Sequence, residues 1–177
     1  MRVAGIVLAA GSGTRFGEPK APVVIDGERL VDHAVRVLRD AGCEPVVVVL
    51  GAWIGDVPNA IIAENADWAE GMGSSLRVGL KAVAPLDVDA AVITLVDLPG
   101  LTSEAVARVA GADAELVAAT YDGERGHPVK FGRGHWEAVS SVAVGDAGAR
   151  TYLSGRGDLM LVEVGDVASG VDLDERD

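Results

Sequence analysis

Residues 3–20, VAGIVLAAGSGTRFGEPK, join a short apolar run to a loop rich in glycine. The apolar run predicts a buried strand over Val3–Ala9. Glycine lets the backbone turn with positive φ and come close to a ligand, and the N–H groups of such a loop can point at phosphate oxygens. Arg15 and Lys20 add positive charge that core packing does not explain. The stretch therefore predicts a polyphosphate site at the carboxyl end of a buried strand.

Two common phosphate-binding loops do not fit this stretch. A P-loop ends in Gly-Lys-Ser/Thr, whereas Lys20 here stands between a proline and an alanine. The dinucleotide fingerprint is G-x-G-x-x-G, whereas the glycines of residues 11–17 are spaced G-x-G-x-x-x-G. Pro19 and Pro22 also oppose the helix that would follow that fingerprint. We expect a longer loop wrapped around a triphosphate; the alternative is a plain turn after a strand.

Length and composition limit the class of protein. A chain of 177 residues fits one domain, taken as 1–177. Hydrophobic residues make up 49% and aromatic residues only 4%, so Val, Ala, Leu and Ile must build the core, as suits a parallel sheet covered by helices. The net charge of −12 argues against binding nucleic acid or an anionic membrane. Cys43 is the one cysteine, which favours a reducing, cytoplasmic location.

The rest of the chain alternates between strand and helix patterns. Apolar runs predict strands at 45–50, 60–63, 90–96, 116–121, 127–131 and 159–164, and helical spacing predicts helices at 28–41, 74–84, 103–110, 134–142 and 147–153. We expect Ser74 or Ser75 to cap the second helix and Thr102 or Ser103 the third. The turn-rich residues 122–126 predict a hairpin. This alternation predicts a layered α/β fold with a mostly parallel sheet, and ligands bind such sheets at the carboxyl ends of the strands.

Carboxylates lie at two places where a metal ion could be held. Asp97 closes the apolar run AAVITLVD, a good position for a Mg²⁺ ligand, although it could instead cap the next helix. Asp172 and Asp174 alternate in the C-terminal segment VDLDERD and would share a face if that segment were extended. Taken alone, the segment is more typical of a solvated acidic tail.

Three further segments contain candidate binding residues. In NADWAEGMGSSL, residues 65–76, backbone groups at the glycines could read a base edge and Ser74 or Ser75 could bond the base or ribose; the alternative is core packing and helix capping. In GHPVKF, His127 is either a contact for a second substrate or structural. In GDAGAR, Asp146 is expected to cap a helix carrying Arg150, and the two form an ion pair or part of an acceptor site. No zinc-ligand pattern is present in the sequence.

In this order, these segments resemble the MobA-like nucleotidyltransferases, and among them the molybdenum cofactor cytidylyltransferase branch. That branch has LAAGxSxRMGxxK, N-x-x-W-x-x-GM-x-x-SL, D-x-P, GHPV-x-F, GD-x-GAR and DIDTPED. The chain has LAAGSGTRFGEPK, NADWAEGMGSSL, VDLP, GHPVKF, GDAGAR and DLDERD. The match covers about residues 5–174. The resemblance implies a single three-layer α/β/α domain with a Rossmann-like nucleotidyltransferase (GT-A-like) fold.

The resemblance also implies roles for individual residues. Arg15, Lys20 and Asp97 would be catalytic, and Mg²⁺ would be bound by Asp97 and Asp174. His127, Asp146 and Arg150 would border the acceptor. The residues expected to bind the nucleotide are Leu8, Ala9, Ala10, Gly11, Gly13, Lys20, Gly71, Met72 and Ser75.

The implied reaction transfers a nucleoside monophosphate to a phosphorylated acceptor and releases pyrophosphate. Ala10 gives LAAG, as in cytidylyl enzymes, where guanylyl relatives have LAGG, so CTP is favoured and GTP is the alternative. The implied acceptor is molybdopterin, and a molybdoenzyme or its chaperone is an expected partner. Phe16 for Met, Leu98 for Gln and Glu175-Arg176 for Thr-Pro are departures from the pattern, the last of which weakens the role of Asp174.

Three other functions stay open. The acceptor could be a sugar phosphate or a polyol phosphate. The chain could be a non-catalytic module that binds and delivers a pterin nucleotide, since the altered tail leaves room for a lost metal ligand. A dinucleotide-binding oxidoreductase is the third alternative, and the loop spacing and Lys20 argue against it.

Overall fold

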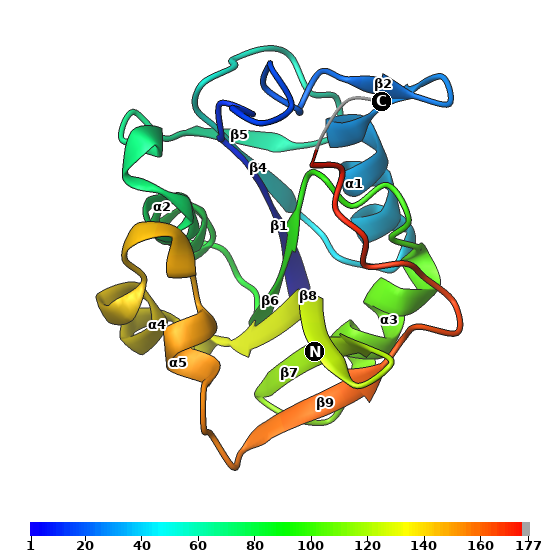
Figure 1. Ribbon diagram of the computed structural model, residues 1–177. Helices are drawn as coiled ribbons and strands as arrows, with labels where there is room; N and C mark the ends of the chain where they lie inside the picture. Colours follow the sequence, from blue (N-terminus) through cyan, green and yellow to red (C-terminus); the bar gives the residue numbers. More distant parts are fainter. Residues whose placement is uncertain (175–177) are drawn as a thin grey trace.

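The computed structural model describes residues 1–174, and within them seven strands form one sheet in the order β5-β4-β1-β6-β8-β7-β9 (Figure 1). Only β8 is antiparallel to its neighbours, and the other pairings are parallel. The prediction of a mostly parallel sheet is therefore confirmed. The strands are β1 (Val3–Ala9), β4 (Val46–Leu50), β5 (Ile61–Glu64), β6 (Ala90–Leu95), β7 (Leu116–Tyr121), β8 (Glu124–Gly132) and β9 (Leu159–Glu163).

The central strands are apolar on both faces because helices cover both sides of the sheet. All five residues of β4, VVVVL, are buried. On one face lie α1 (Leu30–Asp40) and α3 (Ser103–Gly111); on the other lie α2 (Met72–Val83), α4 (Trp136–Val142) and α5 (Arg150–Leu153) (Figure 1). Alternate residues of β1, β4, β6 and β7 enter two separate cores, as the period of a strand requires. The three-layer α/β/α architecture is thus confirmed.

Three helices begin two residues away from their predicted starts: α1 and α4 begin later, and α2 begins earlier. Helix α1 begins at Leu30 because β2 (Val24–Ile25) and β3 (Glu28–Arg29) pair as a small hairpin just before it. Helix α2 begins at Met72 with Gly71 as its N-cap. Ser74 and Ser75 lie inside the first turn, so the prediction that one of them caps this helix was wrong. The prediction for α3 is confirmed, since the Thr102 hydroxyl accepts a hydrogen bond from the Ala105 N–H.

The helix predicted at 147–153 is broken in the structure. Gly148 has a φ of 55° and separates the 3-10 turn η3 (Gly145–Ala147) from α5. Asp146 lies inside that turn, and no side chain caps α5, so the prediction that Asp146 caps the helix carrying Arg150 was wrong. Two further 3-10 turns precede α2 and α4, namely η1 (Trp68–Glu70) and η2 (Arg133–His135).

The C-terminal segment returns to the carboxyl end of the sheet instead of extending into solvent. It runs past α3 toward α1 (Figure 1). The Ser169 N–H donates to the Gly100 carbonyl at 3.1 Å, and the Leu173 N–H donates to the Asp97 carbonyl at 2.9 Å. The preference for a solvated tail was therefore wrong for residues up to 174. Glu175-Arg176, which depart from the family pattern, lie outside the described residues.

Candidate functional site

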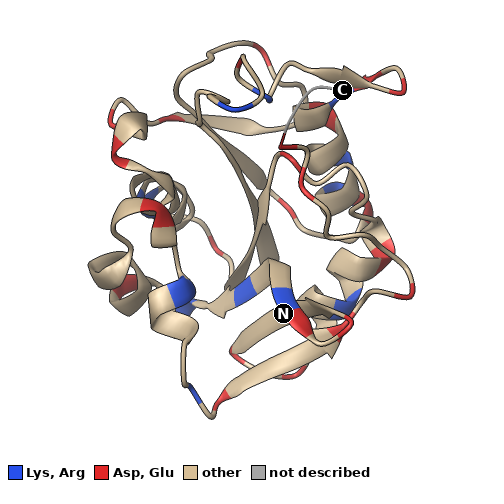
Figure 2. Ribbon diagram, viewed as in Figure 1, with Lys and Arg blue, Asp and Glu red and all other residues tan. Residues whose placement is uncertain are grey.

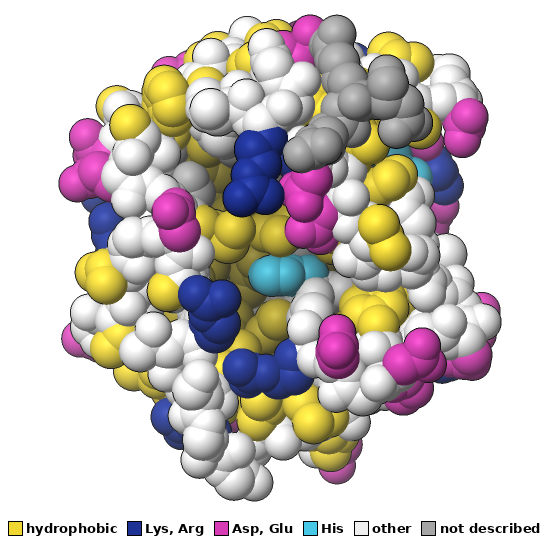
Figure 3. Space-filling view, viewed as in Figure 1, with side chains coloured by type: hydrophobic (Ala, Val, Ile, Leu, Met, Phe, Trp, Pro, Cys, Tyr) yellow, Lys and Arg dark blue, Asp and Glu magenta, His cyan; other side chains and the backbone are white. Residues whose placement is uncertain are grey.

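A cleft of about 350 Å³ opens at the carboxyl ends of β1 and β6. Figure 3 shows this face hollowed, with apolar side chains on the floor and charged side chains at the rim. The loop after β1 forms one wall, and the residues from Trp68 to the first turn of α2 form another. All the residues expected to bind the nucleotide line it: Leu8, Ala9, Ala10, Gly11, Gly13, Lys20, Gly71, Met72 and Ser75.

The loop after β1 folds back on itself, and this requires glycine. Gly13 has a φ of 65°, and its carbonyl accepts a hydrogen bond from the Gly17 N–H at 2.7 Å. A Cβ atom at Gly13 would lie 1.7 Å from the Glu18 carbonyl oxygen, so no other residue fits there. Arg15 is exposed on this loop, and the described residues that line the cleft do not include it.

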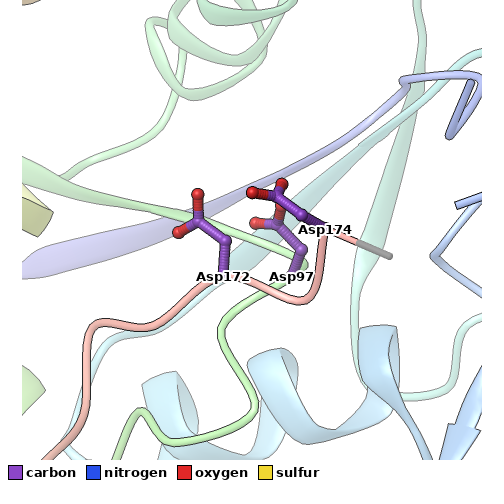
Figure 4. Close-up of side chains that lie close together, drawn as sticks. All are labelled: Asp97, Asp172 and Asp174. Carbon is purple, nitrogen blue, oxygen red and sulfur yellow. The ribbon is translucent and has the colours of Figure 1, made fainter. Parts of the chain in front are cut away.

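Three carboxylates meet at one end of the cleft. Ligand oxygens of Asp97, Asp172 and Asp174 lie within 4.8 Å of one another (Figure 4). The Oδ1 atom of Asp97 is buried and has no hydrogen-bond partner among the described residues. Desolvation raises the pKa of Asp172, and the charges of Asp97 and Asp174 raise it further. The sequence analysis named Asp172 beside Asp174 but assigned only Asp174 to the metal, and the structure places Asp172 in the same cluster.

Lys20 lies against this carboxylate cluster. Its Nζ is 3.1 Å from Asp97 Oδ2 and 3.8 Å from Asp174 Oδ1, and its side chain is 15% exposed. In Figure 2, basic positions in the loop after β1 face acidic positions in the C-terminal segment. Hard divalent cations such as Mg²⁺ and Mn²⁺ prefer oxygen ligands, and the unpartnered Asp97 Oδ1 has room for such a bond. The residues present therefore fit a divalent metal ion.

The three expected acceptor residues are only partly brought together. His127 is half-buried on β8, and burial lowers its pKa to about 4, with Asp97 acting in the opposite direction. Its imidazole is therefore neutral at pH 7. Asp146 lines the cleft, but Arg150 is exposed and is not among the described lining residues. The structure gives no ion pair between Asp146 and Arg150, both of which it describes.

The wall opposite the carboxylates is neutral and internally hydrogen-bonded. Asn65 is buried, and its amide donates to the hydroxyls of Ser74 and Ser75. The backbone there is tightly packed, since a Cβ atom at Gly71 would lie 2.6 Å from both the Asp146 carboxylate and the Gly145 carbonyl. Sequence reasoning did not single out Asn65; its position at the start of the NADW motif was the available signal.

A Rossmann-like sheet with a Gly-rich loop, a lysine and carboxylates at the carboxyl ends of its strands defines a nucleotide-binding α/β protein. Residues 5–160 match the family model described as the MobA-like NTP transferase domain. The chain belongs to this family, and its class is nucleotidyltransferase. The family resemblance stated from the sequence is confirmed.

Two relatives show how broad this family is. The chain is 36% identical over 190 residues to a protein of Paenarthrobacter nicotinovorans named nicotine blue oxidoreductase, covering 97% of this chain and 92% of that protein. It is 31% identical over 142 residues to the molybdenum cofactor guanylyltransferase of Rhodobacter capsulatus, covering 78% of this chain and 68% of the relative. The first relative bears an oxidoreductase name, so membership of this family does not by itself identify the reaction.

The fold is shared with solved structures. Rv0371c of Mycobacterium tuberculosis superposes with a TM-score of 0.82 at 25% identity, covering 97% of this chain and 93% of that chain. A manganese complex of the same protein has a TM-score of 0.74 at 27% identity, covering 97% of this chain and 94% of that chain. No helix among the described residues is both long and apolar enough to cross a membrane.

Proposed function

We propose that this protein transfers CMP from CTP to a phosphorylated acceptor, molybdopterin, and releases pyrophosphate with the help of Mg²⁺. The observation that carries the proposal is the position of Lys20. Its ammonium lies 3.1 Å from Asp97 in a cleft that the Gly-rich loop also lines. A carboxylate cluster that could hold a cation and a Gly-rich loop that could bind phosphates share one cleft, which supports nucleotidyl transfer.

Each part of the cleft has a chemical task in this proposal. The backbone N–H groups of Gly11 and Gly13 would bind the triphosphate, and Lys20 would offset charge near the α-phosphate. Arg15, exposed on the same loop, would close over the departing pyrophosphate. Asp97 and Asp174, together with Asp172, would hold the metal ion. When bound, a divalent ion acts as a Lewis acid that neutralises phosphate charge.

The reaction needs no general base from the protein. An acceptor phosphate oxygen would form a bond to the α-phosphorus in line with the leaving pyrophosphate, and a phosphate monoester is already ionised at neutral pH. The neutral imidazole of His127 and the carboxylate of Asp146 would then serve as hydrogen-bonding groups for the acceptor, with Arg150 at its outer edge. We place the protein in the reducing cytoplasm, because Cys43 is the one cysteine in the sequence.

The test measures first binding and then turnover. Thermal stability is recorded with CTP, GTP, ATP or UTP, with Mg²⁺, with Mn²⁺ or with a chelator; a ligand at a hundred times its Kd stabilises the native state by about 2.7 kcal/mol. Pyrophosphate release is then followed with molybdopterin and with sugar and polyol phosphates as acceptors. A metal-dependent shift that is larger for CTP than for GTP, followed by release with molybdopterin, is the expected result. A larger shift with GTP would overturn the choice of base.

An oxidoreductase is the second candidate. The relative named nicotine blue oxidoreductase covers 97% of this chain at 36% identity, more of it than the guanylyltransferase does. The same stability measurement with NAD, NADH and NADPH tests this function. A shift with a dinucleotide, and none with any triphosphate in the presence of metal, would replace the transferase proposal. The spacing of the Gly-rich loop leads us to expect the opposite.

A further inference from the structure

We infer that Asn65 is a positioning residue, which turns the hydroxyl of Ser75 so that it donates a hydrogen bond to the nucleotide in the cleft. The inference rests on the proposed function, because it assumes that a nucleotide occupies this cleft. Asn65 follows β5 directly, and only 3% of it is exposed. Its own N–H donates to the Leu50 carbonyl at 2.7 Å, so the backbone at this position is held by β4.

The orientation of the Asn65 amide follows from a backbone group. The Asp67 N–H can only donate, and it lies 3.0 Å from Asn65 Oδ1. The side-chain oxygen must therefore face Asp67, and the NH₂ group must face the first turn of α2. There Nδ2 donates to Ser74 Oγ at 2.9 Å and to Ser75 Oγ at 3.0 Å, which uses both of its hydrogens.

Both serine hydroxyls accept a hydrogen bond from the Asn65 amide, but they differ in where their own hydrogen is donated. Ser74 Oγ donates its single hydrogen to backbone oxygen, with the Gly71 carbonyl at 2.9 Å and the Asp67 carbonyl at 3.1 Å. Ser75 Oγ accepts from Asn65, and the structure gives it no second partner among the described residues. Its hydrogen must point away from the Asn65 amide, since two donors cannot face each other.

Ser75 lines the cleft, and Ser74 is not among the described lining residues. Ser75 is 5% exposed, so its hydroxyl has little access to bulk water. An enclosed donor of this kind recognises a hydrogen-bond acceptor on its ligand, such as a carbonyl oxygen or unprotonated ring nitrogen of the base. Cytosine presents both of these on one edge. A site that offers a fixed donor gains affinity because the hydroxyl does not have to be reoriented on binding.

The test is a double-mutant cycle on nucleotide binding. Isothermal titration with CTP and Mg²⁺ compares the wild type with Ser75→Ala, Asn65→Ala and the double variant; Ser74→Ala is the matched control, because it removes the other hydrogen bond to the same amide. We expect Ser75→Ala to weaken binding about fivefold to tenfold, in line with one lost hydrogen bond. Asn65→Ala should weaken binding in the wild type but not in the Ser75→Ala background. Ser74→Ala should change affinity less than about twofold.

Asn65→Asp keeps the shape of the side chain and the bond from the Asp67 N–H, so it serves if Asn65→Ala does not fold. A carboxylate accepts from the Ser75 hydroxyl and turns its hydrogen away from the cleft, so the loss should exceed that of Ser75→Ala and should shrink in the Ser75→Ala background. The positioning role would be overturned if an Asn65 variant lost the same CTP affinity in the wild-type and Ser75→Ala backgrounds. It would also be overturned if Ser74→Ala lost as much CTP affinity as Ser75→Ala. A wild type that binds neither CTP nor GTP would overturn the proposed function itself, before any variant is compared.

Discussion

The two walls of the cleft are built in opposite ways. The carboxylate wall, defined by Lys20, Asp97, Asp172 and Asp174, is charged, and its members come from distant parts of the sequence. The amide wall is defined by Gly71 and Ser75, which line the cleft, and by Asn65 and Ser74, which are hydrogen-bonded to each other. These four residues are neutral and come from one short stretch. The first depends on how the whole chain folds, whereas the second depends mainly on its own hydrogen bonds.

This difference predicts how each wall responds to a ligand. On the carboxylate wall, Lys20 is paired with Oδ2 of Asp97, so its ammonium and a metal ion must compete for the charge of the same carboxylate. On the amide wall, the side-chain donors of Asn65 and Ser74 are already used, and only the Ser75 hydroxyl has no acceptor among the described residues. We therefore expect charge changes to alter turnover and metal affinity on the first wall, and shape changes to alter stability and base affinity on the second.

The largest effect should come from Asp97→Asn. This change removes the charge of the carboxylate whose Oδ1 is buried without a partner among the described residues, so the metal ion loses a charged ligand and keeps at most a neutral amide oxygen. We expect turnover measured as pyrophosphate release to fall about 10²- to 10³-fold. The control is Asp87→Asn, because the Asp87 side chain is 98% exposed and its ion-pair partner among residues 1–174 is an exposed Arg2. Retained metal-dependent turnover in Asp97→Asn would mean that the carboxylate wall does not bind the catalytic metal ion.

Lys20→Ala should produce two opposite changes. Turnover should fall about 10²-fold, because the phosphates lose a counter-charge. Affinity for Mn²⁺ without nucleotide should rise, since the ammonium 3.1 Å from Asp97 no longer competes with the ion. Titration of Mn²⁺ followed by electron paramagnetic resonance measures the second change, and Lys81→Ala, an exposed lysine at the end of α2, is the control. Weaker Mn²⁺ binding would mean that Lys20 does not compete for the metal site.

The contrast between the walls also explains what the sequence could predict. The strand ends and the Gly-rich loop are local patterns: β1 has the predicted bounds, Val3–Ala9, and the cleft forms where that strand ends. Asp172 could not be assigned in this way. Its place depends on the Leu173 N–H meeting the Asp97 carbonyl, a contact across 76 positions that an alternating acidic segment does not reveal.

The amide wall was mispredicted for a different reason. Ser74 and Ser75 are good N-cap residues by type, but Gly71, with a φ of 107°, begins the helix earlier. The serines then fall in the first turn, where Asn65 meets them. A buried asparagine that bonds two hydroxyls looks in sequence like any polar loop residue, so only the fold distinguishes it.

Gly71→Ala tests the amide wall by shape. Gly71 and Gly123 both have positive φ, 107° and 83°, but a Cβ atom meets Asp146 and Gly145 at 2.6 Å only at Gly71; at Gly123 nothing lies within 4 Å. Gly123→Ala should therefore lower the free energy of unfolding by roughly 1–2 kcal/mol for the backbone alone. Gly71→Ala should lower it by about 1–3 kcal/mol more, since the contact adds overpacking. Urea denaturation measures both free energies of unfolding. Equal losses in the two variants would mean that the residues around Gly71 shift to accommodate the added Cβ atom.

The smallest effect should come from Glu163, a carboxylate away from both walls. The N–H groups of Gly123, Asp122 and Gly165 donate to it and lower its pKa to about 2, with help from the Thr120 hydroxyl. A native pKa below the ordinary value of 4.5 means that this stabilisation is fully present above about pH 4.5 and is lost as the pH falls through about 2.

Glu163→Gln should therefore be less stable than the wild type at pH 7, and the difference should shrink as the pH falls from about 4.5 to 2. Urea denaturation across this range measures the difference, with the exposed Glu137→Gln on α4 as control. CTP affinity at pH 7 should be unchanged, because Glu163 does not line the cleft among the described residues. A difference that stays constant with pH would mean that the ionised carboxylate does not hold the β7–β8 turn. A loss of CTP affinity in Glu163→Gln would mean that a carboxylate outside the carboxylate wall also contributes to nucleotide binding.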